Sequence, residues 1–218
     1  MERTAAASTL LSARCCIVGG GPAGMMLGLL LARAGVDTIV LEKHNDFLRD
    51  FRGDTIHPST LELMYELGLL DEFLKRPHNE LAQIEGQIGN ERVVIGDFSH
   101  LPTRCKFIAL MPQWDFLDFL AEKARRYPSF RIEMECEGDD LLIENGRVVG
   151  VAARGPRGAL DIRAALVIGA DGRHSTVRAK ARLESRDLGA PIDVLWMRVP
   201  KQPGDAITPL GRIDTGRI

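Results

Sequence analysis

The chain has 218 residues, of which 45% are apolar and 27% are charged. A chain of this length can fold as one complete domain with a sizeable core and the beginning of a second domain. Its 28 basic and 30 acidic residues give a formal net charge of −2 and form no long block of one sign. This balance excludes the strongly basic surface that binds nucleic acid or an anionic membrane, so we expect neither as a partner.

The cysteines and histidines predict neither disulfide bonds nor a metal site. Cys15, Cys16, Cys105 and Cys136 form no CxxC pair, and they are too few for a disulfide scaffold. The five histidines lack the spacing of metal ligands. We therefore expect reduced core thiols in a cytoplasmic protein. The longest apolar stretch, residues 25–32, is about half as long as a membrane span.

The beginning of the chain predicts a β-α-β unit. Residues 14–19 form a short apolar run that ends in glycines, and residues 22–34 are rich in alanine, leucine and methionine, which favours a helix. Gly35 is suited to end that helix. Residues 37–41 then form a second, β-branched strand that leads to Glu42.

The rest of the sequence predicts strands inserted between helices. Residues 58–69 and 112–127 place apolar side chains at helical spacing. Between them, residues 82–98 alternate around glycines, which predicts a hairpin. Further strands are expected at 131–135, 140–143, 147–153, 166–169 and 194–199, with a helix near 175–181. The predicted fold class is α/β, a Rossmann-like domain with a parallel sheet and inserted antiparallel strands.

The clearest chemical signal is the sequence Gly19-Gly20-Gly21-Pro22-Ala23-Gly24, which matches G-x-G-x-x-G between the first strand and the first helix. Gly19 allows a tight turn, Gly21 lets the backbone approach a diphosphate, and Gly24 permits close packing of helix on strand. The diphosphate would then meet the positive end of the helix dipole. The motif alone is a weak signal, and its position between strand and helix makes it specific.

An acidic residue at the end of the second strand indicates which nucleotide the motif holds. Glu42 lies 18 positions after Gly24, where a carboxylate accepts hydrogen bonds from ribose hydroxyls. A carboxylate here disfavours a 2′-phosphate, so the expected ligand is FAD or NAD rather than NADP. We include Lys43, the next residue, among the expected cofactor-binding positions.

Three separated motifs together resemble the p-hydroxybenzoate hydroxylase-like flavoprotein monooxygenases, the single-component aromatic hydroxylases. Besides the glycine motif, Ala170-Asp171-Gly172 with Ser175 and Arg178 resembles the D-G segment of that family. Residues 52–62 resemble its arginine segment after the second strand. The resemblance implies FAD as the bound cofactor, NAD(P)H as a transient co-substrate, and hydroxylation of a small aromatic substrate with O2.

The resemblance also assigns individual residues to the cofactor site. Asp171 and Gly172 are expected near the cofactor, and Arg178 is suited to neutralise phosphate. Arg52 corresponds to an arginine near the flavin diphosphate or the incoming nicotinamide, and Gln113 corresponds to a glutamine that lies against FAD. The alternatives are an ordinary Asp-Gly turn, surface arginines and a polar residue at a helix start. No catalytic residue is predicted.

A discontinuous FAD-binding domain follows from the same resemblance. We assign residues 1–184 to it, without its carboxyl-terminal segment, and residues 185–218 to the beginning of a substrate-binding domain. Gly96-Asp97 and Gly204-Asp205 look like a later G-D motif of the family, but both are predicted to be loops. Two other functions are open: another FAD-dependent reaction of the same fold, such as halogenation or reduction, and a non-catalytic FAD-binding fragment.

Overall fold

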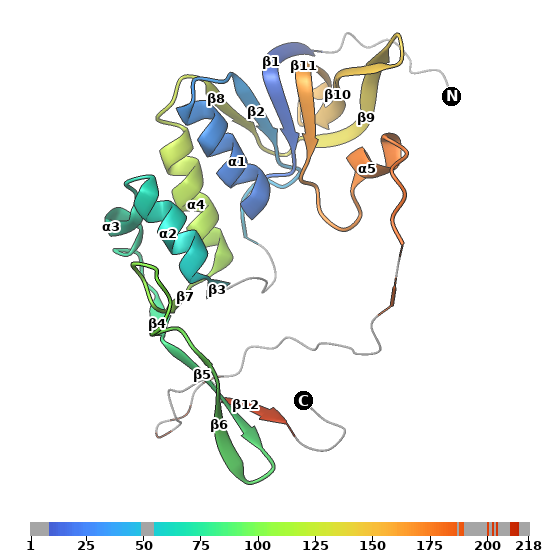
Figure 1. The fold of residues 1–218 in the computed structure, drawn as a ribbon. Coiled ribbons are helices and arrows are strands. Elements are labelled where there is room, and N and C mark those ends of the chain that lie inside the picture. Colours follow the sequence, from blue (N-terminus) through green and yellow to red (C-terminus); the bar gives the residue numbers. More distant parts are fainter. Residues whose placement is uncertain are drawn as a thin grey trace. The chain divides into compact units, whose positions relative to one another are not determined.

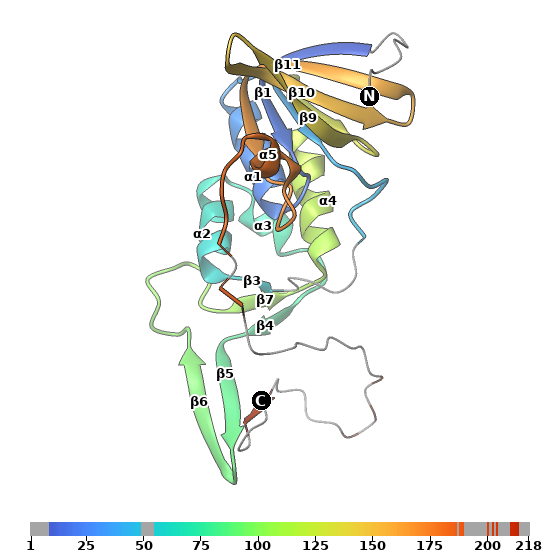
Figure 2. The same ribbon diagram turned by 90° about the vertical axis from the view of Figure 1, so that its right-hand side faces the viewer.

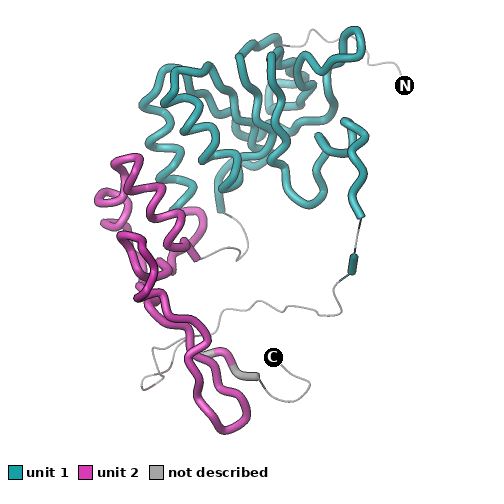
Figure 3. The backbone as a smooth tube through the Cα atoms, in the orientation of Figure 1, with its two compact units in different colours: residues 1–48, 116–191 teal, residues 49–115, 192–218 magenta. Residues whose placement is uncertain are grey.

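The chain divides into two compact units. The structure is a computed structural model, and it describes residues 9–48, 55–186, 188, 189, 200, 202, 204 and 210–213. Unit 1 comprises residues 1–48 and 116–191, and unit 2 comprises residues 49–115 and 192–218 (Figure 3). The domain division that we expect between residues 184 and 185 stays a prediction.

Unit 1 is built on a six-stranded mixed sheet in the order β8-β2-β1-β11-β10-β9 (Figure 1). β2 and β11 pair in parallel with β1, β8 pairs in parallel with β2, and β10 and β9 are antiparallel. The predicted α/β class, a parallel sheet with antiparallel strands, is confirmed. The strands are β1 (Thr9–Val18), β2 (Thr38–Leu41), β8 (Phe130–Glu133), β9 (Glu137–Glu144), β10 (Arg147–Gly155) and β11 (Gly158–Gly169).

Two details of this sheet differ from or refine the sequence prediction. β11 is longer than the strand expected at 166–169, because residues 160–164 also pair with β1. The turn between β9 and β10 has Asn145 at φ +50 and Gly146 at φ +77. Two successive left-handed residues are typical of the tight turn that joins antiparallel strands.

Glycines bring the first helix close to the parallel part of the sheet. α1 (Pro22–Arg33) begins with Pro22. The N–H groups of the first helical turn have no partner within the helix, so a proline there, which lacks an N–H, costs no helical hydrogen bond. A Cβ on Gly28 would lie 2.9 Å from Val40 of β2 and 3.0 Å from Phe130 of β8. A larger side chain at this position would push the helix away from both strands.

The antiparallel half of the sheet folds back over the other face of the parallel half. Gly138 of β9 lies against Val18 of β1, since a Cβ on Gly138 would be 2.9 Å from Val18 Cγ1. Buried side chains from both halves form one core cluster, which includes Cys16, Ile39 and Ile162. The core of unit 1 therefore lies inside a curled sheet as well as beneath α1.

Two further helices pack apolar side chains in unit 1. Val177 of α5 (Thr176–Lys180) is partly buried and packs against the core cluster. α4 (Gln113–Ala124) belongs to unit 1 from Phe116 onward and buries Phe116 and Leu120. Both helices lie where the sequence predicts them.

Unit 2 contains two three-stranded sheets and two helices in the part of the chain that the structure describes (Figure 2). The expected hairpin is confirmed, and Gly96 and Asp97 end its second strand rather than forming the predicted loop, because they pair with Ile84 and Gln83. The strand expected at 194–199 lies outside the described residues. The elements are β3 (Thr55–Ile56), α2 (Pro58–Glu66), α3 (Leu70–Phe73), β4 (Asn79–Leu81), β5 (Gln83–Ile88), β6 (Glu91–Asp97), β7 (Ile108–Leu110) and β12 (Leu210–Ile213).

The four cysteines are buried and free. Burial, with smaller contributions from Cys15 and Cys136, raises the pKa of Cys16 to about 12, because a thiolate loses its hydration in the core. Burial, with smaller contributions from Glu133 and Asp139, raises the pKa of Cys136 to about 11. Both thiols therefore bind their protons more tightly in the folded protein than in the unfolded chain, where the pKa is 9.0.

This difference predicts a loss of stability in alkali. The contribution of each thiol is fully present below pH 9 and is lost as the pH rises toward the pKa of the folded state, because the unfolded chain releases the proton first. Between pH 8 and pH 10 we expect each thiol to lower the free energy of unfolding by about 1.4 kcal/mol. Urea denaturation under reducing conditions should therefore show a smaller decline for Cys16→Ala than for the natural sequence. Equal declines would contradict this account.

Candidate dinucleotide-binding site

The glycine turn between β1 and α1 is shaped by close backbone contacts. Gly19 has φ +110, a left-handed conformation that favours glycine. A Cβ on Gly19 would lie 2.3 Å from the carbonyl oxygen of Ala170, and a Cβ on Gly24 would lie 1.9 Å from the carbonyl oxygen of Gly19. Side chains at these two positions are therefore excluded by the fold itself.

Gly21 is different, because no atom of the described residues lies within 4 Å of the place where its Cβ would be. It is the N-cap residue of α1, and no side chain caps this helix end. The first turn also contains no acidic residue. The free N–H groups at the start of α1 thus lie beside an open space at Gly21. Free amides next to open space are what a diphosphate requires for binding at a helix start. Pro22 and Ala23 occupy the first two helical positions.

Glu42 lies beside this turn, as the sequence spacing predicts. Its side chain is only 7% exposed. The Gly20 N–H donates a hydrogen bond to Oε2 of Glu42 at 3.1 Å, and the His44 N–H donates to Oε1 at 3.0 Å. The carboxylate is therefore held in a defined orientation next to the glycine turn. Its contact with a ribose stays a prediction.

Sequence reasoning missed the role of Gly20 in this arrangement. A Cβ on Gly20 would lie 2.8 Å from the Cβ of Glu42 and 2.9 Å from Oε2. The motif G-x-G-x-x-G allows any residue at the position of Gly20, so the motif itself does not predict a glycine there. The need for glycine becomes visible only when the acid after β2 is placed against the turn.

The Asp171-Gly172 turn follows β11 at the same edge of the sheet. Val18 pairs with Gly169, and the Ala170 N–H donates to the carbonyl of Val18 at 2.7 Å. Since Gly19 packs against the carbonyl of Ala170, the first motif and the D-G segment are adjacent in the structure. Parallel pairing of β1 and β11 is the cause, because it places both strand ends on one side.

The side chain of Asp171 organises the start of α5. Its Oδ1 accepts a hydrogen bond from Ser175 Oγ at 2.5 Å, and its Oδ2 accepts one from the Val177 N–H at 3.1 Å. Ser175 Oγ in turn accepts from the Arg178 N–H at 2.9 Å. The guanidinium of Arg178 donates to the carbonyl of Arg173, so it is held within its own loop, and its expected contact with phosphate stays a prediction.

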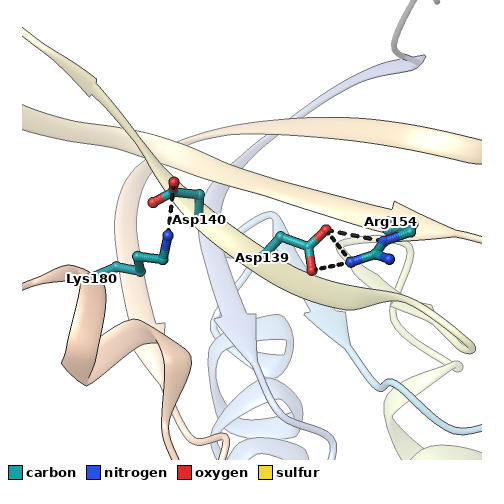
Figure 4. Close-up of polar contacts among 4 residues, drawn as sticks. All are labelled: Asp139, Asp140, Arg154 and Lys180. Atoms are coloured by element: carbon teal, nitrogen blue, oxygen red, sulfur yellow. Dashed lines mark hydrogen bonds and ion pairs between the residues drawn. The ribbon is translucent and has the colours of Figure 1, made fainter. Parts of the chain in front are cut away.

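One charged pair connects α5 to the antiparallel strand β9, and a second pair connects β10 to β9 (Figure 4). Lys180 of α5 lies 3.0 Å from Asp140 of β9, and Arg154 of β10 lies 2.8 Å from Asp139. The hydrogen bonds that Arg154 donates to the carboxylate of Asp139, and then the negative charge of Asp139, raise the pKa of Arg154. These pairs are exposed, so each contributes little to stability; they orient side chains beside the site.

An open cavity of about 480 Å³ lies next to Glu42. Lys43 and His44 line it together with Glu135, Glu137 and Arg154. Lys43 is exposed there, so its expected cofactor contact stays a prediction. Lys43 and His44 precede Glu135, Glu137 and Arg154 by more than 90 residues in the chain, and the sequence has no local pattern that predicts their meeting.

Two expected cofactor residues belong to unit 2 or to residues that are not described. Gln113 is the first residue of α4, as predicted. Arg52 lies outside the described residues. Contacts of both residues with a cofactor stay predictions.

The described residues contain no group of three or more histidine, cysteine or acidic side chains that could hold a metal ion. No described helix reaches the length and apolarity that crossing a membrane requires.

Comparison with known proteins identifies the family. A family described as an FAD binding domain matches residues 12–206, so the chain belongs to this family. It is 34% identical over 189 residues to the 6-methylpretetramide 4-monooxygenase of Streptomyces rimosus, a match that covers 84% of this chain and 44% of that protein. The chain covers between 31% and 44% of the length of the curated relatives that match it most strongly. The resemblance to FAD-dependent monooxygenases predicted from the motifs is confirmed.

Solved structures agree with this assignment. The crystal structure of p-nitrophenol 4-monooxygenase from Pseudomonas putida DLL-E4 is similar with a TM-score of 0.69 and 28% identity, over 79% of this chain and 44% of that chain. A myxobacterial chondrochloren halogenase has the same fold, with a TM-score of 0.69 and 24% identity over 78% of this chain and 39% of that chain. The fold alone is therefore shared by enzymes of different reactions.

The contrast between Gly21 and Gly24 predicts two separable defects. Gly21→Ala should change the free energy of unfolding by less than about 0.5 kcal/mol, because its Cβ meets nothing. It should weaken FAD binding about tenfold or more, because the methyl group occupies the diphosphate position. Gly24→Ala should destabilise the fold by roughly 1–3 kcal/mol through overpacking. Thermal unfolding and flavin fluorescence titration measure both effects; normal FAD affinity in Gly21→Ala would refute the site.

The capping role of Asp171 predicts a local effect. Asp171→Ala removes the acceptor of the Val177 N–H, so hydrogen exchange at this amide should become about tenfold faster or more. Asp171→Asn is the control, because it keeps an oxygen that can accept the same hydrogen bond. Unchanged protection of the Val177 amide in Asp171→Ala would show that the carboxylate does not hold α5.

Proposed function

We propose that the protein is an FAD-dependent monooxygenase that uses NAD(P)H and O2 to hydroxylate a small aromatic substrate. One observation carries the proposal: the open glycine turn, the buried Glu42 and the Asp171-Gly172 turn meet at the carboxyl ends of neighbouring parallel strands. This is where open α/β sheets bind nucleotides. The names of the relatives, which are monooxygenases of aromatic compounds and of tetracycline precursors, support the reaction.

The geometry fits FAD. The amides at the start of α1 would hold the diphosphate beside Gly21, and Glu42 would accept hydrogen bonds from the adenosine ribose. A 2′-phosphate would meet the buried carboxylate and be repelled, which disfavours NADP at this position. Lys43 would then lie near the outer part of the adenosine, next to the open cavity.

The remaining residues have positioning roles in this proposal. Asp171 would keep Gly172, at φ +84, in the conformation that presents its backbone to the cofactor. Arg52, Gln113 and Arg178 would contact the cofactor or the incoming nicotinamide. When bound, FAD supplies the electron transfer and the reaction with dioxygen that protein side chains cannot perform.

NAD(P)H is proposed as the reductant and as a transient co-substrate, since the single G-x-G-x-x-G fingerprint of these 218 residues is assigned to FAD. The three-stranded sheet of β12, β5 and β6 supports our assignment of residues 185–218 to the beginning of a substrate-binding domain. The four buried free thiols support a cytoplasmic location.

Two other functions are compatible with parts of the structure. The shared fold of the chondrochloren halogenase supports an FAD-dependent reaction other than hydroxylation. The second alternative is a non-catalytic FAD-binding fragment, which would use the same glycine turn and Glu42.

Purified protein distinguishes these functions. We expect it to be yellow, with the visible absorbance of bound flavin, and to oxidise NAD(P)H faster when phenolic compounds are added. Product analysis should show a hydroxylated ring. Flavin binding without NAD(P)H oxidation would favour the non-catalytic fragment, and a halogenated product that requires halide would favour the halogenase. A protein with no affinity for FAD would refute all three.

A further inference from the structure

The backbone of Glu135 has a conformation that glutamate does not favour. Its φ is +54, in the left-handed region that glycine adopts without strain and asparagine adopts more readily than most residues. Asn145 and Arg182 also have positive φ, but Asn145 lies in the turn between β9 and β10, and Arg182 follows the end of α5, where left-handed residues commonly end a helix. Glu135 lies in the connection between β8 and β9, which are not paired with each other. Its conformation therefore has another cause.

Two backbone hydrogen bonds fix this conformation. The Glu135 N–H donates to the carbonyl of His44 at 2.9 Å, and the Cys136 N–H donates to the carbonyl of Glu42 at 2.8 Å. The connection is thereby fastened to the loop that carries the Glu42 carboxylate. Glycine would make the same backbone hydrogen bonds with less strain, because neither bond involves the side chain. The backbone explains the conformation, but it does not explain a glutamate at this position.

The side chain of Glu135 belongs to the lining of the open cavity beside Glu42. The cavity has a volume of about 480 Å³, a size typical of small-molecule sites. Lys43 also lines it. Arg154, a third charged residue of the lining, donates to both carboxylate oxygens of Asp139 (Figure 4). The cavity therefore offers a ligand an acceptor on Glu135 and a donor on Lys43.

The proposed cofactor has complementary groups at this place. In an adenosine diphosphate group, the diphosphate and the base are attached to opposite sides of the ribose. With the diphosphate beside Gly21 and the ribose hydroxyls on Glu42, the base is directed away from α1, toward the cavity that begins at Lys43. Adenine presents an amino group, which donates hydrogen bonds, and ring nitrogens, which accept them. A carboxylate and an ammonium group match these two kinds of group.

We propose that Glu135 determines which base the site accepts: its carboxylate accepts a hydrogen bond from the amino group of the adenine. The inference rests on the proposed cofactor site and adds a selection of the base to it. Hypoxanthine has a carbonyl oxygen in place of that amino group, and two facing acceptors repel each other. A site that hydrogen-bonds an N–H group discriminates against an analogue that lacks it. Because this cavity is open to solvent, we expect a preference of about tenfold, well below that of a closed site.

Binding of ADP and IDP to the purified chain, freed of flavin, tests the inference. The two nucleotides share the ribose and the diphosphate and differ only in the base. Calorimetric titration should show ADP binding about tenfold more tightly than IDP, and FAD should displace both. In Glu135→Gln the amide can turn either its oxygen or its NH2 group toward the base, so the two affinities should differ by less than about threefold.

Glu133→Gln is the matched control for the change of charge. Glu133 lies two residues earlier, its carboxylate is 3.5 Å from Arg131, and it does not belong to the lining of the cavity. The preference for ADP should therefore stay at about tenfold in this variant.

Glu135→Gly separates the backbone from the side chain. Glycine relieves the left-handed strain, so urea denaturation should show a folding equilibrium constant about threefold higher than in the natural sequence. The affinity for ADP should fall about tenfold, and its preference over IDP should disappear, because the carboxylate is gone. A residue that only shaped the loop would not change the ratio of ADP to IDP affinity.

The outcomes separate this inference from the proposed function. Equal affinities of the natural chain for ADP and IDP, or an unchanged preference in Glu135→Gln, would overturn the role of Glu135 and leave the cofactor site intact. Loss of the preference in Glu133→Gln would also overturn it, because the effect would then follow net charge rather than contact. If neither ADP nor FAD binds, the cofactor site itself is refuted, and the proposed function falls together with this inference.

Discussion

The parallel pairing of β1 with both β2 and β11 is the constraint on which the site depends. It brings Gly19, Glu42 and Asp171, which follow three different strands, to one edge of the sheet. The contacts there are backbone contacts: the carbonyl of Ala170 fills the space beside Gly19, and the carbonyl of Gly19 fills the space beside Gly24. Such contacts tolerate no side chain, so glycine is required twice before any ligand is considered.

The two carboxylates of the site, Glu42 and Asp171, accept hydrogen bonds from backbone amides. Glu42 accepts hydrogen bonds from two backbone amides, and Asp171 accepts from a backbone amide and a serine hydroxyl. Both carboxylates are thereby oriented before a ligand arrives, which reduces the entropy lost on binding. The amides at the start of α1 stay open beside Gly21. A diphosphate could therefore bind to these amides without a rearrangement of the glycine turn.

Family membership and reaction have different support. Residues 12–206 match an FAD binding domain family, and the geometry of the glycine turn agrees with a dinucleotide site. The reaction depends on residues near the flavin ring and the substrate. The fold is shared by monooxygenases and a halogenase, so hydroxylation is supported mainly by the names of relatives at about one third identity.

The sequence by itself determined the β-α-β unit, the glycine turn, the acid at Glu42 and the hairpin, because each depends on local patterns within about 30 residues. It did not predict that residue 20 must be glycine, that Asp171 caps α5, or that the side chain of Leu166 is exposed. Gly20 and Leu166 depend on neighbours from distant parts of the chain, and the cap depends on side-chain orientation that spacing does not reveal. Only the tertiary structure decided these features, because contacts between segments that are distant in the sequence form only when their strands pair in the sheet.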